Sequence, residues 1–131
     1  MTIKPSIAVV DDDESVREAT TSLLRSLGYI AKGFPSADDF MKSNRLRITS
    51  CLVADVQMPG LSGLALYGQL AASGNPIPTI LITAYPDEEI RSRALSAGVT
   101  GYLVKPFSEK ELLDCIDMTI KHGSRIAPPR G

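Results

Sequence analysis

Short apolar runs alternate with amphipathic segments along the whole chain. Five runs of strand length occupy residues 6–10, 29–34, 51–55, 79–83 and 101–104. Apolar residues recur at helical spacing over residues 15–27, from 36 to a polar loop at 43–49, over 62–72 and 86–97, and from 108 onward. Strands that alternate with helices over short connections are typical of a parallel sheet with helices on both faces.

Polar residues at the ends of the predicted helices carry capping signals. Ser15 and Glu18 have the spacing of a capping box at the start of the first helix, and Ser108 and Glu111 repeat it at the start of the last. Gly28 follows the first helix, where a glycine commonly ends a helix. These signals place the first helix at 15–27 and the start of the last helix at 108.

The order of the strands follows from the character of the second run. Residues 29–34 alternate in polarity and include Lys32, which suits an edge strand. With right-handed crossovers, we expect a flavodoxin-like α/β fold: a doubly wound five-stranded parallel sheet in the order 2-1-3-4-5, with five helices. Strands one and three are then neighbours where the strand order reverses, and ligands of such sheets bind beyond the carboxyl ends of the strands.

Length and composition limit the classes of function. A chain of 131 residues with 44% hydrophobic content can form one core, and we predict a domain over 1–122 and a linker-like tail over 123–131. The net charge of −1 provides no general attraction for nucleic acid or anionic membranes. No apolar run is long enough to span a bilayer, and residues 1–5 lack the apolar segment of a signal peptide, so we expect a cytoplasmic location.

Three residues that often carry chemistry have neutral interpretations here. Cys51 and Cys115 lie in apolar contexts without metal-binding spacing, which predicts buried structural thiols. His122 lies in a polar segment with no partner motif, and we expect it to be solvated.

Four of the predicted strands end at polar residues that can bind ions. These residues are Asp11, Asp12, Asp55, Thr83 and Lys105. Three carboxylates at one edge repel one another unless a cation lies among them, and such oxygen ligands suit Mg²⁺ or another divalent cation such as Mn²⁺. A carboxylate can also attack phosphorus, and Mg²⁺ with Lys105 would neutralise the phosphoryl oxygens while Thr83 donates to one of them. Taken alone, the acids at 11–13 could equally form a polar turn with a helix N-cap.

Four separated motifs make the chain similar to the receiver domain of bacterial two-component response regulators. They are Val10-Asp11-Asp12, Asp55 with Met58-Pro59-Gly60, Thr83-Ala84, and Lys105-Pro106, in the order and approximate spacing of that family. The resemblance covers roughly residues 5–122. It implies that Asp55 accepts a phosphoryl group from the phosphohistidine of a sensor histidine kinase, as a signalling switch rather than a turnover enzyme.

The resemblance also implies a cation site around the acceptor. Asp12, Asp55 and the main-chain carbonyl of Gln57 would bind Mg²⁺, with Asp11 acting mostly through water. Lys105 would hold the phosphoryl group.

A switching mechanism is implied by the same resemblance. Thr83 would move toward the phosphoryl group, and Tyr102 matches the aromatic residue that turns inward when it does. The face formed by the fourth helix, fifth strand and fifth helix would then change, leading to dimerisation or release of an output domain. Gln57 and Tyr85 match positions through which the family varies the lifetime of the phosphate.

Alternatives to a switch with an attached output domain stay open. A free-standing receiver would have the same sequence up to about residue 122, and a degenerate receiver would act only as a protein-interaction module. Phosphatases of the haloacid-dehalogenase kind carry Asp-x-Asp, whereas Gln57 stands at the second position here and leaves no general acid. The motifs most resemble regulators with a C-terminal helix-turn-helix DNA-binding domain, so we expect such a domain, a histidine kinase and a phosphorylation-dependent homodimer as partners.

Overall fold

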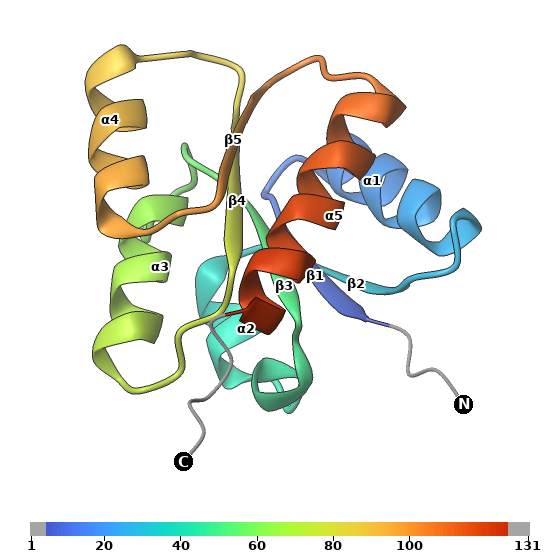
Figure 1. The fold of residues 1–131 in the computed structure, drawn as a ribbon, viewed down its shortest axis with the longest axis horizontal. Coiled ribbons are helices and arrows are strands. Elements are labelled where there is room, and N and C mark those ends of the chain that lie inside the picture. Colours follow the sequence, from blue (N-terminus) through green and yellow to red (C-terminus); the bar gives the residue numbers. More distant parts are fainter. Residues whose placement is uncertain (1–4, 126–131) are drawn as a thin grey trace.

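The structure is a computed structural model that describes residues 5–125. These residues form a single five-stranded sheet flanked by helices (Figure 1). The strands are β1 (Ser6–Val10), β2 (Ile30–Phe34), β3 (Cys51–Asp55), β4 (Thr79–Thr83) and β5 (Gly101–Val104). The helices are α1 (Glu14–Ser26), α2 (Ala37–Lys42), α3 (Gly63–Ala72), α4 (Glu88–Ala97) and α5 (Glu109–Arg125). All neighbouring strands are parallel, in the order β2-β1-β3-β4-β5, which confirms the predicted fold.

Helices cover both faces of the sheet, and a hydrophobic cluster lies under each layer. Figure 1 shows α3 and α4 on one side and α1 and α5 on the other. Phe40 of α2 and Leu66 of α3 are buried in the first cluster, and Leu24 of α1 and Ile116 of α5 in the second. Strands β1, β3 and β4 are therefore buried along their whole length, as expected for central parallel strands.

Helix α1 begins earlier than its capping signal predicts. The N-cap is Asp13, whose carboxylate accepts a hydrogen bond from the Val16 amide (3.1 Å), so the prediction that Ser15 caps this helix is wrong. Asp13 has the extended backbone of an N-cap residue and lies directly after the loop from β1, so the chain already turns into the helix at Glu14. The local Ser15–Glu18 spacing could not reveal this.

The start of α5 matches its capping signal. The Glu111 amide donates to Ser108 Oγ (3.0 Å), and the Ser108 amide donates to Glu111 Oε1 (2.8 Å), which is the reciprocal pattern of a capping box. The helix then continues to Arg125, past the predicted domain end at 122, so part of the predicted tail is helical. The domain boundary itself stays a prediction, and residues 126–131 and the His122 side chain lie outside the described part of the structure.

Three further predictions concern the loop at 43–49, the two cysteines and membrane-spanning helices. The predicted loop at 43–49 contains a short 3-10 helix, η1 (Leu46–Ile48). Cys51 is fully buried and Cys115 half-buried, and burial raises the pKa of both thiols, in agreement with a structural role. Among the described residues, no helix is long and apolar enough to cross a membrane.

Candidate functional site

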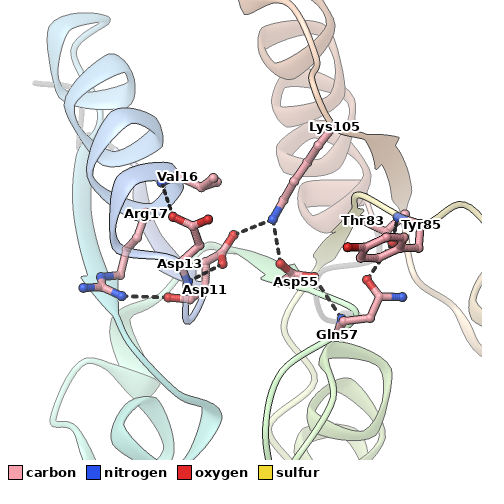
Figure 2. Close-up of polar contacts among 9 residues, drawn as sticks. All are labelled: Asp11, Asp13, Val16, Arg17, Asp55, Gln57, Thr83, Tyr85 and Lys105. Atoms are coloured by element: carbon pink, nitrogen blue, oxygen red, sulfur yellow. Dashed lines mark hydrogen bonds and ion pairs between the residues drawn. The ribbon is translucent and has the colours of Figure 1, made fainter.

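The parallel strands bring the predicted polar residues to one edge of the sheet. Val10 pairs with Ala54, so the residue after β1, Asp11, emerges beside Asp55 at the end of β3. Lys105 follows β5 and reaches back across the edge toward both acids (Figure 2). This arrangement needs only the parallel topology, because the carboxyl ends of all five strands lie at the same edge.

Lys105 forms an ion pair with each of two buried carboxylates. Its Nζ lies 2.6 Å from Oδ2 of Asp55 and 3.1 Å from Oδ2 of Asp11, and its side chain is only 16% exposed. Burial of the ammonium group lowers the pKa of Lys105, but the hydrogen bonds and charges of Asp55 and Asp11 outweigh it, so the pKa is raised. Lys105 is therefore a firmly charged group between the two acids.

The carboxylate of Asp11 is fully buried. Desolvation raises its pKa, and the charge of Asp55 raises it further. The hydrogen bonds from the Asp13 amide and from Lys105 lower the pKa but do not outweigh burial, so the pKa lies above the ordinary value. One ammonium group thus neutralises this pair of acids incompletely.

A third carboxylate completes an acidic cluster. Asp11, Asp12 and Asp55 each offer an oxygen, and these three oxygens lie within 4.8 Å of one another. Three carboxylates and one ammonium group leave an excess of negative charge. Asp12 is exposed while the other two acids are buried, so the cluster opens to solvent on one side. A hard, all-oxygen donor set with access for water fits Mg²⁺ or Mn²⁺.

Hydrogen bonds hold the loop that carries these acids. Asp11 Oδ1 accepts from the Asp13 amide (2.9 Å), and the main-chain oxygen of Asp11 accepts from Nη1 of Arg17 (2.8 Å). Asp13 in turn caps α1 (Figure 2). The N-cap interpretation is therefore correct for Asp13, while Asp11 and Asp12 belong to the cluster. The contribution of Arg17 was missed, because a main-chain partner gives no signal in the sequence.

Close packing of α3 against the end of β3 restrains the main chain at Asp55. A Cβ atom on Gly63 would lie 2.5 Å from the main-chain oxygen of Asp55 and 2.9 Å from Leu81 Cδ2. Only glycine allows the first turn of α3 to approach the end of β3 this closely. The backbone that carries the Asp55 carboxylate is therefore held against a helix.

Thr83 reaches the site through Gln57 rather than through Asp55. Its buried hydroxyl donates to Oε1 of Gln57 (2.8 Å) and accepts from the Tyr85 amide (2.9 Å). The main-chain amide of Gln57 donates to Oδ1 of Asp55 (2.9 Å), so Gln57 contacts both Asp55 and Thr83 (Figure 2). The sequence predicted a role only for the main-chain carbonyl of Gln57 and for its family position. It contained no signal for the side-chain bond.

Tyr102 lies in β5, and its side chain contacts the start of α4 rather than the acids. It is half-buried, and its hydroxyl accepts a long hydrogen bond from the amide of Asp87, the N-cap of α4 (3.4 Å). The aromatic residue that was predicted as part of the switch therefore contacts the same β4–α4 segment that Thr83 holds through Tyr85. Its role in switching stays a prediction.

The fold and the cluster together define a doubly wound α/β domain with three carboxylates and a lysine at the carboxyl edge of its sheet. A match to the family "Response regulator receiver domain" covers residues 7–117. The chain therefore belongs to the receiver domain family of response regulators, as the motifs predicted.

Individual relatives agree with this membership. Nodulation protein W of Bradyrhizobium diazoefficiens is 42% identical over 113 residues, which are 86% of this chain and 50% of that protein. The transcriptional regulatory protein FixJ of the same organism is 32% identical over 127 residues, 97% of this chain and 62% of FixJ. The solved structure of the response regulator StyR has a TM-score of 0.85 at 42% identity, covering 94% of this chain and 62% of that one. The chain spans about half the length of the curated relatives it matches.

Proposed function

We propose that this domain is a phospho-accepting switch in which Asp55 takes a phosphoryl group from a sensor histidine kinase. The contact that carries the proposal is the 2.6 Å ion pair between Lys105 and Asp55, beside two further carboxylates. A carboxylate oxygen of Asp55 attacks phosphorus, the P–N bond of the phosphohistidine breaks, and its electron pair stays with the departing imidazole. The product is an acyl phosphate on Asp55.

Each nearby group has a task in this transfer. Lys105, already beside Oδ2 of Asp55, follows the added charge onto a phosphoryl oxygen, and Thr83 donates to another. The carboxylates of Asp11, Asp12 and Asp55, with the Gln57 carbonyl, would hold Mg²⁺ or Mn²⁺. When bound, the cation supplies charge neutralisation at the phosphoryl oxygens.

An apolar groove beside the site is a candidate docking surface for the kinase. It has a volume of about 540 Å³ and lies between α1 and the loop that joins β5 to α5, and Lys105 is among its lining residues. Its apolar lining is formed by Val16, Ala19, Leu23, Ala84, Pro106 and Phe107. A partner that delivers a phosphohistidine to Asp55 must dock within reach of this edge, and the groove offers apolar surface for it.

We also propose how the switch acts on other parts of the protein. Because the match spans only 50% of nodulation protein W and 62% of FixJ, which is named a transcriptional regulatory protein, we propose a receiver that runs to the end of α5 at Arg125, a linker after it and a C-terminal helix-turn-helix DNA-binding domain, in a cytoplasmic protein. Thr83 and Tyr102 would transmit phosphorylation to the face of α4, β5 and α5. Exposed Leu95, Val104 and Met118, one from each element, would favour a phosphorylation-dependent homodimer through this face.

The test is intact-mass analysis after incubation with acetyl phosphate, with and without Mg²⁺. The wild type and Asp13→Asn, which removes a neighbouring charge outside the cluster, should each gain one Mg²⁺-dependent phosphoryl adduct. Asp55→Asn should gain none. An adduct that survives Asp55→Asn, or no adduct at all, would favour the interaction-module alternative. Repeated release of phosphate from small substrates would instead identify a phosphatase.

A further inference from the structure

The hydroxyl of Thr83 both donates and accepts a hydrogen bond. It donates its single proton to Oε1 of Gln57 (2.8 Å) and accepts from the Tyr85 amide (2.9 Å). A threonine hydroxyl has only one proton to donate. Thr83 therefore cannot donate to a phosphoryl oxygen on Asp55 while it is bonded to Gln57.

We propose that the side chain of Gln57 is a latch that holds Thr83 in the resting arrangement and so sets how readily the domain switches. The inference rests on the proposed function, because it assumes that Asp55 is phosphorylated. Gln57 is well placed for this task, since its main-chain amide donates to Asp55 (2.9 Å) while its side-chain oxygen accepts from Thr83 (Figure 2). The same residue touches the group that is modified and the group that must move.

The latch also acts on the segment between β4 and α4. The Tyr85 amide is bonded to the Thr83 hydroxyl, and the Asp87 amide is bonded to the Tyr102 hydroxyl (3.4 Å). When Thr83 turns from Gln57 toward the phosphoryl group, its hydroxyl oxygen moves, and the bond that this oxygen accepts from the Tyr85 amide weakens. The strength of the Gln57–Thr83 bond therefore counts directly in the equilibrium between the resting and switched arrangements.

The expected size of the effect is modest. A neutral hydrogen bond contributes little in net terms, which corresponds to a change of about 2- to 10-fold in an equilibrium constant. Gln57 is exposed and water can replace its acceptor, so the lower part of that range, about 2- to 5-fold, is expected.

Two substitutions separate the latch from other roles of Gln57. Gln57→Met keeps the length of the side chain and the main-chain amide and carbonyl but removes the acceptor. Gln57→Glu keeps a side-chain acceptor and should rescue the latch. In the unphosphorylated protein, hydrogen exchange of the Tyr85 amide, followed by NMR, should be about 2- to 5-fold faster in Gln57→Met and unchanged in Gln57→Glu. In a Thr83→Val background, Gln57→Met should have no further effect, because the donor is already gone.

The second measurement is the rate at which acetyl phosphate forms the adduct, which should rise in Gln57→Met by the same factor. Unchanged Tyr85 exchange in Gln57→Met would overturn the latch, whether or not an adduct forms. Faster exchange with an unchanged rate of adduct formation would overturn it as a control on switching. Faster exchange in a protein that forms no adduct in any variant would instead show that the proposed function has failed, and the latch would fall with it.

Discussion

Removing the charge of Asp12 should stabilise this domain when divalent cations are absent. Asp12 is exposed, yet its carboxylate lies in a cluster whose three oxygens are within 4.8 Å of one another. The other two acids, Asp11 and Asp55, share a single ammonium group, that of Lys105. Asp12 therefore faces a net negative charge, and Asp12→Asn relieves this repulsion without opening a cavity.

The size of the gain follows from the separation of the charges. Two like charges 4.8 Å apart repel by about 0.9 kcal/mol in a water-like medium and by about 1.7 kcal/mol at an effective dielectric constant of about 40. Because Asp12 is exposed, the lower value applies, and the free energy of unfolding should rise by about 1 kcal/mol. For a domain of this size, that corresponds to a melting temperature higher by roughly 3–5 °C.

The assay is urea unfolding in EDTA and then in increasing Mg²⁺. The wild type should gain stability with Mg²⁺, by about 2.7 kcal/mol at a concentration a hundred times the dissociation constant. Asp12→Asn should gain much less at the same concentration. The matched control is Asp13→Asn, which removes a neighbouring exposed charge but keeps a residue that caps α1 equally well, so it should stay within about 0.5 kcal/mol of the wild type.

Three results would refute this reasoning. If Asp12→Asn unfolds more easily than the wild type in EDTA, the carboxylate is not under net repulsion in the folded state. If the wild type and Asp12→Asn gain equally from Mg²⁺, the cation does not bind at the cluster. A gain of stability in Asp13→Asn as large as that in Asp12→Asn would mean that the effect is one of overall charge.

Three further predictions test the packing and electrostatics around the site by urea unfolding. Gly63→Ala should cost roughly 1–3 kcal/mol, since its Cβ would lie 2.5 Å from the Asp55 main-chain oxygen, whereas Gly68→Ala in the same helix meets nothing within 4 Å and should gain about 0.5–1 kcal/mol. The raised pKa of Asp11 means that the folded state binds a proton at this carboxylate more tightly than the unfolded state does, so the stabilisation from this proton is present below the unfolded pKa near 3.8 and is lost as the pH rises through the folded pKa. The stability of Asp11→Asn relative to the wild type should therefore increase as the pH rises from about 4 to 7 in metal-free buffer. A constant difference would contradict this. Ser108→Ala should cost about 0.5–2 kcal/mol through loss of the α5 cap, and Ser108→Thr should recover most of it.

The strands were more predictable than the helix ends. The runs 51–55, 79–83 and 101–104 are apolar because each lies in the sheet under helices, and the structure has strands with the same bounds. The start of α1 was predicted at the wrong residue because several nearby side chains could serve as its cap. The choice of Asp13 depends on the path of the chain as it leaves β1, which is a tertiary property.

The cluster was predictable for a topological reason. Once the strands are parallel and ordered, the acids after β1 and at the end of β3 must be neighbours, and the structure brings Asp11, Asp12 and Asp55 together. The bond from Thr83 to Gln57 was not predictable. It joins side chains from the ends of adjacent strands and depends on the rotamer of an exposed glutamine, which no spacing in the sequence specifies.

The resting contacts of Thr83 and Lys105 bear on how far phosphorylation could shift this domain. Thr83 would exchange a neutral acceptor on Gln57 for a charged phosphoryl oxygen, a gain of about 1 kcal/mol from typical hydrogen-bond strengths. A shift from 1:99 to 99:1 needs about 5.5 kcal/mol, so this exchange cannot drive the switch alone. If Asp55 is phosphorylated as proposed, most of the difference would come from charge, through the phosphoryl group, Lys105 and a bound cation. Changing Gln57 should therefore adjust the response to phosphorylation, whereas removing Lys105 should abolish it.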